Sequence, residues 1–384
     1  MNNTRELLEE RKALREDLLA GKKPKRVLAY PRFTLEAGCG LTGTNLMEAH
    51  YNTEQREKAY DGICKTFYSD TLPIRDTRYP GTYQLLGAKN WILASGGAVQ
   101  HPEIETMRAE EYDEFIAAPC GVILEKFLPR VCTALEGDPV NRGLTLAAAF
   151  GDYCNQERAQ ALICEGLNRK YGYCAGFITN QRILAPFDFL ADQLRGFKSI
   201  TMDIRRVPDK IKAALEVITP LMIKMASPAV RRPGLISLIP LHLAPFINMK
   251  QFEELYWPSL EKTVVELDRR GVACMLQVEQ DCTRYAEYFA RLPASTLFMI
   301  ESGDPARFTE TLGKDHVFGG FYDPTITLTR GTEECIDEAK RLLEICMKSD
   351  HAYFIFDRVV MDIKSVNVSR LRAVLEWVRD NAEY

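Results

Sequence analysis

The sequence lacks a hydrophobic run long enough to cross a membrane. Its apolar stretch at residues 234–245 is short and broken by prolines, whereas a membrane helix needs roughly 20 apolar residues. The chain also opens on polar and charged residues, without the apolar segment of a secretory signal. We therefore expect a cytoplasmic protein without a membrane partner, in which residues 234–245 form a buried strand.

An excess of positive charge is also absent. Lys and Arg total 49 against 53 Asp and Glu, which gives a formal net charge of −4. A balance of this sign provides no general attraction to nucleic-acid phosphates or anionic lipid. We expect a small-molecule substrate and no nucleic-acid partner.

Cysteine is not scarce, but its pattern does not favour disulfides. The 11 cysteines are spread along 384 residues, and an odd number cannot pair completely within one chain. Reduced thiols in a cytosolic protein are the simpler interpretation. We expect a monomer or a symmetric homodimer without structural disulfides.

The second half of the chain alternates strand-like and helix-like segments. Apolar runs suited to buried strands occur at residues 235–241, 273–278, 296–300, 317–321 and 353–356. Amphipathic helices are predicted between and after them, at residues 249–270, 283–291, 306–312, 332–348 and 366–381. Such alternation is typical of a parallel sheet with helices outside it. Five units in about 150 residues, with room for three more before them, favour a closed eight-fold barrel.

The first half is less regular. Helices are predicted at residues 5–19, 55–67, 110–135, 141–172 and 208–225, and a strand at residues 26–33. Residues 70–82 are predicted to be an irregular loop. The three glycines of residues 38–43 suggest another loop, but without the spacing of a nucleotide-binding loop, which disfavours a doubly wound sheet. We expect one domain over residues 1–384, with residues 1–25 as an N-terminal helical extension.

Several segments resemble one known family. Residues 107–115, 185–196, 203–208, 245–258 and 279–293, together with Asn367, are similar to a branch of the uroporphyrinogen decarboxylase superfamily. The similarity extends from about Arg26 to the C-terminus. It implies an α/β fold, the (β/α)₈ TIM barrel, with the active site at the C-terminal ends of the strands.

That expectation directs attention to the residues that follow each predicted strand. As catalytic residues we consider Glu279, Asp357 and Tyr322, and as substrate-binding residues Arg32 and Glu301. His242 with Glu279 is a candidate zinc site, because an imidazole with carboxylates can hold a divalent ion. The alternative is that His242, between Leu241 and Leu243, is a core histidine.

The two chemistries of the superfamily leave different signatures. Its decarboxylases carry an arginine-rich segment after the first strand that holds several substrate carboxylates, whereas residues 30–39 contain only Arg32. Its methyltransferases carry a zinc-binding His-x-Cys, where this chain reads Gln277-Val278-Glu279. Neither signature is present as usually written. Cys274 and Cys282 are interpreted as buried thiols.

The resemblance implies methyl transfer as the first function, with a corrinoid protein or a folate-type carrier as the other party. The alternative is decarboxylation of a tetrapyrrole-related or smaller carboxylated substrate by an acid such as Asp357 or Glu279. A second alternative is a non-catalytic barrel that binds a corrinoid or porphyrin. If the strand assignments hold, the candidate residues should face one cavity.

Overall fold

The computed structural model of the chain describes residues 2–74, 78–230, 232–361 and 363–384. Its centre is a parallel sheet with the strand order β3-β4-β5-β6-β7. All five strands coincide with apolar runs of the sequence, as expected for strands covered on both faces. Their bounds are β3 Leu235–Leu241, β4 Val272–Asp281, β5 Leu297–Ser302, β6 Val317–Gly320 and β7 Ala352–Tyr353.

Three extended segments of the first half close this sheet into a barrel. Parallel bridges join Ala29 to Phe354 and Phe33 to Ile74, and further bridges join Thr71 to Cys174 and Arg182 to Leu238. Residues 26–33, 70–74 and 174–183 therefore complete the circle between β7 and β3. The predicted (β/α)₈ barrel is confirmed, although these three segments pair through single bridges.

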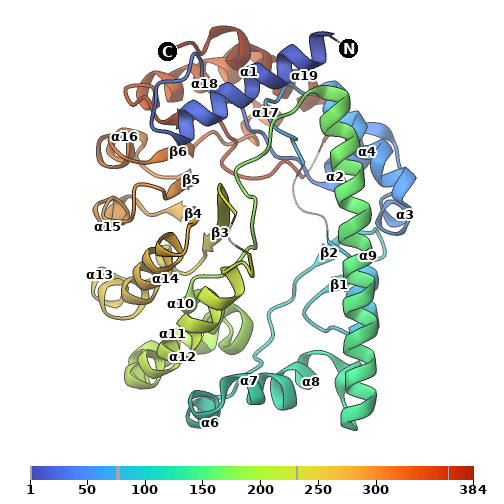
Figure 1. Cartoon of the computed structure of the whole chain (residues 1–384), viewed down its shortest axis with the longest axis vertical. Helices are drawn as coiled ribbons and strands as arrows, with labels where there is room; N and C mark the ends of the chain where they lie inside the picture. Colours follow the sequence, from blue (N-terminus) through green and yellow to red (C-terminus); the bar gives the residue numbers. More distant parts are fainter. Residues whose placement is uncertain (1, 75–77, 231, 362) are drawn as a thin grey trace.

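Helices cover the outside of the barrel, and Figure 1 shows α14, α15 and α16 on the outer side of β4 and β5. The predicted helices of the second half are confirmed, some of them in two or three pieces. The helices from residue 186 onward, predicted or not, are α10 Pro186–Asp188, η4 Phe189–Arg195, α11 Phe197–Arg206, α12 Pro208–Ala226, η5 Ala244–Phe246, α13 Met249–Gln251, η6 Phe252–Tyr256, α14 Trp257–Arg269, η7 Thr283–Tyr285, α15 Ala286–Phe289, α16 Pro305–Leu312, α17 Ile326–Thr329, α18 Thr332–Cys346 and α19 Ser365–Asn381.

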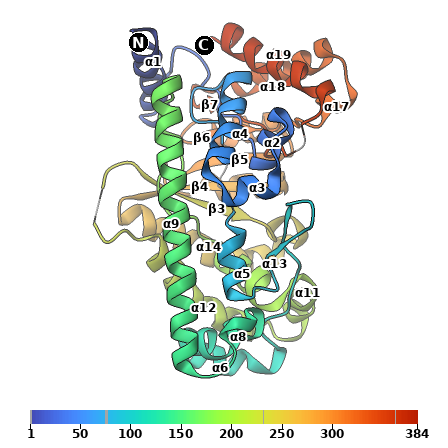
Figure 2. The ribbon, with the colours of Figure 1, turned by 90° about the vertical axis from the view of Figure 1, so that its right-hand side faces the viewer.

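A long excursion separates the second and third barrel segments. It ends in α9, which runs along the molecule beside the barrel in Figure 2 and confirms the helix predicted there. Residues 110–135 are not one helix but several short pieces, and Pro119 begins a new one after the non-helical Ala118. The elements are α5 Pro80–Leu86, β1 Ile92–Leu93, β2 Val99–Gln100, η1 Ala109–Glu111, α6 Tyr112–Ala117, α7 Pro119–Val122, η2 Ile123–Phe127, α8 Leu128–Val131, η3 Thr133–Leu135 and α9 Pro139–Tyr171.

Two loop predictions of the first half are wrong. Residues 38–43 lie largely in a helix, α2 (Leu35–Thr42). The short helix α3 (Leu46–Tyr51) follows it, and α2 packs against the next helix, α4 (Thr53–Thr66). A Cβ on Gly38 would lie 2.8 Å from the Ala59 carbonyl oxygen, so this glycine permits close helix packing and does not form a loop. Residues 70–74 form a barrel segment and α5 begins at Pro80; residues 75–77 lie outside the described part of the chain.

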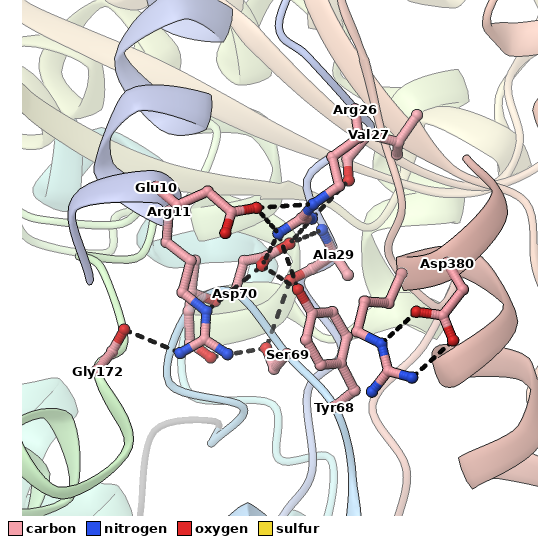
Figure 3. Close-up of polar contacts among 12 residues, drawn as sticks. Glu10, Arg11, Arg26, Val27, Ala29, Tyr68, Ser69, Asp70, Gly172 and Asp380 are labelled. Carbon is pink, nitrogen blue, oxygen red and sulfur yellow. Dashed lines mark hydrogen bonds and ion pairs between the residues drawn. The ribbon is translucent and has the colours of Figure 1, made fainter. Parts of the chain in front are cut away.

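The N-terminal helix α1 (Asn2–Leu19) covers one end of the barrel interior. Its Leu14 and Leu18 are buried together with side chains of the barrel interior such as Leu238 and Met299. Polar contacts fix it there, as Figure 3 shows. The Asp70 carboxylate is fully buried and accepts hydrogen bonds from Arg26 at 2.8 and 2.9 Å, from Tyr68 and from the Ala29 N–H. Arg11 of α1 lies 3.5 Å from the same carboxylate.

Two further expectations concern the whole chain. Within the described residues, no helix combines the length and the apolar character that membrane spanning requires. The same part of the chain contains no disulfide, and eight of the 11 cysteines are buried, among them Cys274 and Cys282.

Candidate active site at the mouth of the barrel

A cavity of about 470 Å³ lies at the C-terminal ends of the barrel strands. We call it the mouth pocket. Pro240 and His242 at the end of β3 and Gln277 and Glu279 of β4 form one side of it. The other side is formed by η4, by the third barrel segment and by the excursion that separates the second and third barrel segments. This is the position at which barrel enzymes carry their active sites.

His242 is held between two carboxylates in this pocket. Its Nδ1 lies 2.5 Å from Asp192 Oδ2, and its Nε2 lies 3.5 Å from Glu279 Oε1. Burial lowers the pKa of His242, but the hydrogen bond with Asp192 and the charges of Glu279 and Asp188 outweigh burial and raise this pKa to about 9. The ring is therefore an imidazolium at neutral pH, with an N–H at both nitrogens.

Asp188 fixes the backbone that carries His242. Its carboxylate is fully buried and accepts hydrogen bonds from the N–H groups of His242 and Leu243, both at 3.0 Å, and from the Tyr256 hydroxyl at 2.7 Å. Burial raises the pKa of Asp188 to about 7, although the charge of His242 opposes this shift. The turn after β3 is thus held in one position, and the imidazolium with it.

The surroundings of His242 do not fit the expected zinc site. His242 and Glu279 supply two donor atoms, Nε2 and Oε1, whereas a zinc site usually has three or four protein ligands. Within the described ranges, no group of three or more His, Cys, Asp or Glu side chains is arranged to hold a metal ion. What the arrangement offers is a proton donor whose pKa lies near that of a phenol.

Cationic and aromatic side chains face His242 across the mouth pocket. Arg78 and Arg182 both contribute to its lining. The Arg78 guanidinium lies 4.1 Å from the ring centroid of Trp91, and His101 packs on the same indole at 4.1 Å. Burial, assisted by Arg78, lowers the pKa of His101. The pocket therefore combines an acid with two guanidinium groups, a combination suited to an anionic substrate.

Of the predicted site residues, only His242 and Glu279 meet in the mouth pocket. Glu301 and Asp357 do not line it and share Arg358, whose Nη2 is 3.4 Å from Glu301 and 3.2 Å from Asp357. Burial raises the pKa of Asp357 to about 6, and Arg358 opposes the shift. These two carboxylates form a separate group at the barrel rim.

Tyr322 and Arg32 lie elsewhere. Tyr322 is fully buried and donates its hydroxyl proton to the Cys335 carbonyl of α18, on the outer side of the barrel. Arg32 is also buried, and neither residue lines the mouth pocket. The expectation that His242, Glu279, Glu301, Tyr322 and Asp357 share one cavity is therefore wrong for Tyr322, Glu301 and Asp357, which do not line the mouth pocket. Successive side chains of a strand point to opposite faces, so a place at the end of a strand does not determine which face a side chain takes.

The sequence interpretation missed Asp192, Arg78 and Arg182. Asp192 lies four residues after Asp188 in the segment that follows the third barrel segment. Arg182 would have been identified if residues 174–183 had been recognised as a strand, because it lies at the end of that segment. Arg78 carries no such signal, because it lies in the irregular part of residues 70–82.

Comparisons with known proteins agree with this architecture. The sequence model of the family described as uroporphyrinogen decarboxylase (URO-D) matches residues 180–375. The fold is similar to that of a methyltransferase from Methanosarcina mazei, with a TM-score of 0.58 and 12% sequence identity over 97% of this chain and 98% of that chain. At this identity the similarity shows the fold. No match to a curated protein sequence was found.

Proposed function

The chain belongs to the uroporphyrinogen decarboxylase family, and within that family we propose that it transfers a methyl group from a small aromatic methyl ether that carries a carboxylate. The observation that supports this proposal is the imidazolium of His242, whose pKa of about 9 is set by Asp192, Glu279 and Asp188. A phenoxide leaving group has a pKa near 10, as in tyrosine. A proton donor of similar pKa is effective in general acid catalysis.

In the proposed reaction the bond between the methyl carbon and the ether oxygen breaks, and its electron pair remains on the oxygen. His242 delivers a proton to that oxygen from Nε2, since Nε2 has the longer contact, 3.5 Å to Glu279, whereas Nδ1 is engaged by Asp192 at 2.5 Å. Asp192 and Glu279 stabilise the imidazolium before the step. Arg78 and Arg182 bind the substrate carboxylate and so orient the ether.

The methyl group requires a nucleophilic acceptor, which a corrinoid protein or a folate-type carrier would supply as the second substrate. The acceptor would approach through the mouth of the barrel, where the pocket lies. Zinc has no role in this proposal, because no group of three or more His, Cys, Asp or Glu side chains in the described residues is arranged to hold a metal ion.

The proposal is tested with methoxybenzoates as methyl donors and reduced cobalamin as the acceptor. We expect enzyme-dependent formation of hydroxybenzoate, measured by chromatography, and of methylcobalamin, measured by absorbance. His242→Asn should slow the formation of both products by about 10²–10⁴, whereas His351→Asn should not, because His351 contacts the Gly313 carbonyl away from the pocket. Absence of both products across donors with ortho, meta and para methoxy groups would contradict the proposal.

Decarboxylation is the second candidate, and the two guanidinium groups at the pocket favour it. They would hold the carboxylates that stay on the substrate while His242 protonates the carbon that loses CO₂. Release of CO₂ from carboxylated aromatics without methyl transfer would support this candidate. We expect no turnover of uroporphyrinogen in either case, because Arg78, Arg182 and the buried Arg32 are too few for its eight carboxylates.

A further inference from the structure

A second cavity, of about 230 Å³, adjoins the mouth pocket. We call it the side pocket. Arg78, Trp91 and Arg182 line both cavities, so the two are neighbouring compartments of one site. The first turn of α2 and His50 of α3 form the other side of the side pocket. The proposed reaction uses neither the first turn of α2 nor His50.

His50 presents a hydrogen-bond acceptor that has no partner. Its side chain is only 3% exposed, and Nε2 lies 2.7 Å from the Gly97 carbonyl oxygen. A carbonyl oxygen only accepts, so the proton is on Nε2. Burial lowers the pKa of His50, and Nδ1 therefore carries a lone pair at neutral pH. Nδ1 is buried and has no hydrogen-bond partner among the described residues.

Arg78 presents the complementary feature, a donor without an acceptor. Its Nη1 is buried and has no hydrogen-bond partner in the described ranges of the chain. The guanidinium packs on Trp91, which fixes its plane but satisfies none of its N–H groups. Leaving a buried donor or acceptor unsatisfied costs roughly 1–3 kcal/mol. A ligand that satisfied both atoms would recover this cost.

The charge of the side pocket favours an anion. Arg78 and Arg182 contribute two positive charges to its lining, and Glu36 contributes one negative charge. Thr34, Leu35 and Glu36 line the pocket from the N-terminal end of α2, a helix of eight residues whose backbone N–H groups point outward at that end. The guanidinium groups and the helix end suit a carboxylate, and Nδ1 of His50 requires a donor from the same ligand.

We propose that the side pocket binds a carboxylate together with an adjacent hydrogen-bond donor, as in a 2-hydroxy or 2-amino acid. Arg78 and Arg182 bind the carboxylate, and Nδ1 of His50 accepts the hydrogen bond from the hydroxyl or ammonium group. The substrate then spans both compartments, with its reacting aromatic end beside His242. The placement of that reacting end rests on the proposed function, whereas binding in the side pocket does not.

The test is the binding of three probes by isothermal titration calorimetry: phenylacetate, which has no donor, mandelate, which has a hydroxyl, and phenylglycine, which has an ammonium. We expect at least one of the two donor-bearing probes to bind about fivefold more tightly than phenylacetate, as one additional buried hydrogen bond provides. Mandelate and phenylglycine distinguish the two kinds of donor. Equal binding of all three probes, or no binding of any, would overturn the proposal.

Variants assign the binding to the side pocket. Arg78→Gln should weaken all three probes at least tenfold, whereas Arg78→Lys, which keeps the charge, should weaken them less. His50→Phe should remove the preference for the donor-bearing probe, because the variant has no acceptor in place of Nδ1. His50→Gln, which restores an acceptor, provides a second measurement if the phenylalanine variant does not fold. Unchanged preferences in Arg78→Gln and both His50 variants would contradict the assignment.

These results are separable from the proposed function, because binding is measured without turnover. Preferential binding of mandelate or phenylglycine with no methyl transfer would support the proposed binding in the side pocket and contradict the proposed methyltransferase activity. Methyl transfer by a protein that binds the three probes equally would do the reverse.

Discussion

At the scale of single residues, the chemistry of the site depends on the environment of His242. Its position after β3 and that of Glu279 in β4 could be predicted, because both strands are long apolar runs with clear ends. Its charge could not, because that depends on Asp192, a residue 50 positions away in the sequence. The zinc hypothesis rested on His242 and Glu279, and within the described residues no third His, Cys, Asp or Glu side chain joins them to hold a metal ion.

Replacement of His242 by Asn should reduce kcat by about 10²–10⁴, the usual contribution of a general acid, with a much smaller change in KM. The activity of the unmodified enzyme should decline as pH rises through about 9, because His242 loses its proton there. Steady-state kinetics between pH 6 and 10 provide both measurements. A rate that increases through pH 9, or a kcat unaffected by the substitution, would exclude His242 as the acid.

At the scale of elements, the stability of the sheet depends on the absence of a side chain at Gly320 of β6. This glycine has φ +134°, and a Cβ there would lie 1.8 Å from the Ile300 carbonyl oxygen of β5. We expect Gly320→Ala to cost more than about 4 kcal/mol of unfolding free energy, or to prevent folding. Urea denaturation followed by circular dichroism measures this change.

Gly143 in α9 provides the matched control. It lies within a helix, and a Cβ there would meet nothing within 4 Å. Gly143→Ala should therefore stabilise the protein by roughly 0.5–1 kcal/mol. Similar effects of the two substitutions would contradict the close approach of β5 and β6.

The attachment of α1 depends on the buried charge of Asp70. Asp70→Asn should destabilise the protein by about 3–5 kcal/mol, because it leaves the buried Arg26 without its charged partner. Glu10 also contacts Arg26, but its side chain is 44% exposed, so Glu10→Gln should cost less than about 1 kcal/mol. Chemical denaturation measures the unfolding free energy of the two variants. An equal loss in both would show that the buried Arg26–Asp70 pair stabilises the protein no more than the exposed contact with Glu10 does.

The elements of the second half could be predicted, and those of the first only in part: the helices α1, α4 and α9 were expected, whereas two of the three barrel segments were not. β3 to β6 are buried apolar runs separated by amphipathic helices, and this periodicity is local. Residues 26–33, 70–74 and 174–183 pair through isolated bridges, so they need no long apolar run. The glycines of α2 suggested a loop, although Gly38 is required by the proximity of Ala59 in α4. That proximity is a tertiary contact, which a local pattern does not contain.

At the scale of the whole molecule, counting strand–helix units identified the barrel, and the family resemblance located its mouth. The long excursion that ends in α9 was not predicted, although it supplies Arg78 and Trp91 to the site. The thiols test the arrangement of the molecule as a whole. Cys120 and Cys154 are exposed, whereas eight cysteines are buried.

We expect brief alkylation of the native protein to modify Cys120 and Cys154 first, and alkylation after unfolding without reductant to modify all 11 cysteines. Mass spectrometry of peptides assigns the sites. Several stable cystines in native material, or rapid native modification of Cys274, which is buried in β4, would contradict the fold described above.

The proposed chemistry requires that His242 is an imidazolium held between the carboxylates of Asp192 and Glu279. The most direct test is a titration of the histidine side chains by ¹⁵N NMR, with the His242 signals assigned by their absence in His242→Asn; the chain has only five histidines. We predict that both ring nitrogens of His242 are protonated at pH 7, that the ring titrates near pH 9, and that Asp192→Asn lowers this pKa. A neutral His242 ring at pH 7, titrating at or below pH 6.5, would contradict the account.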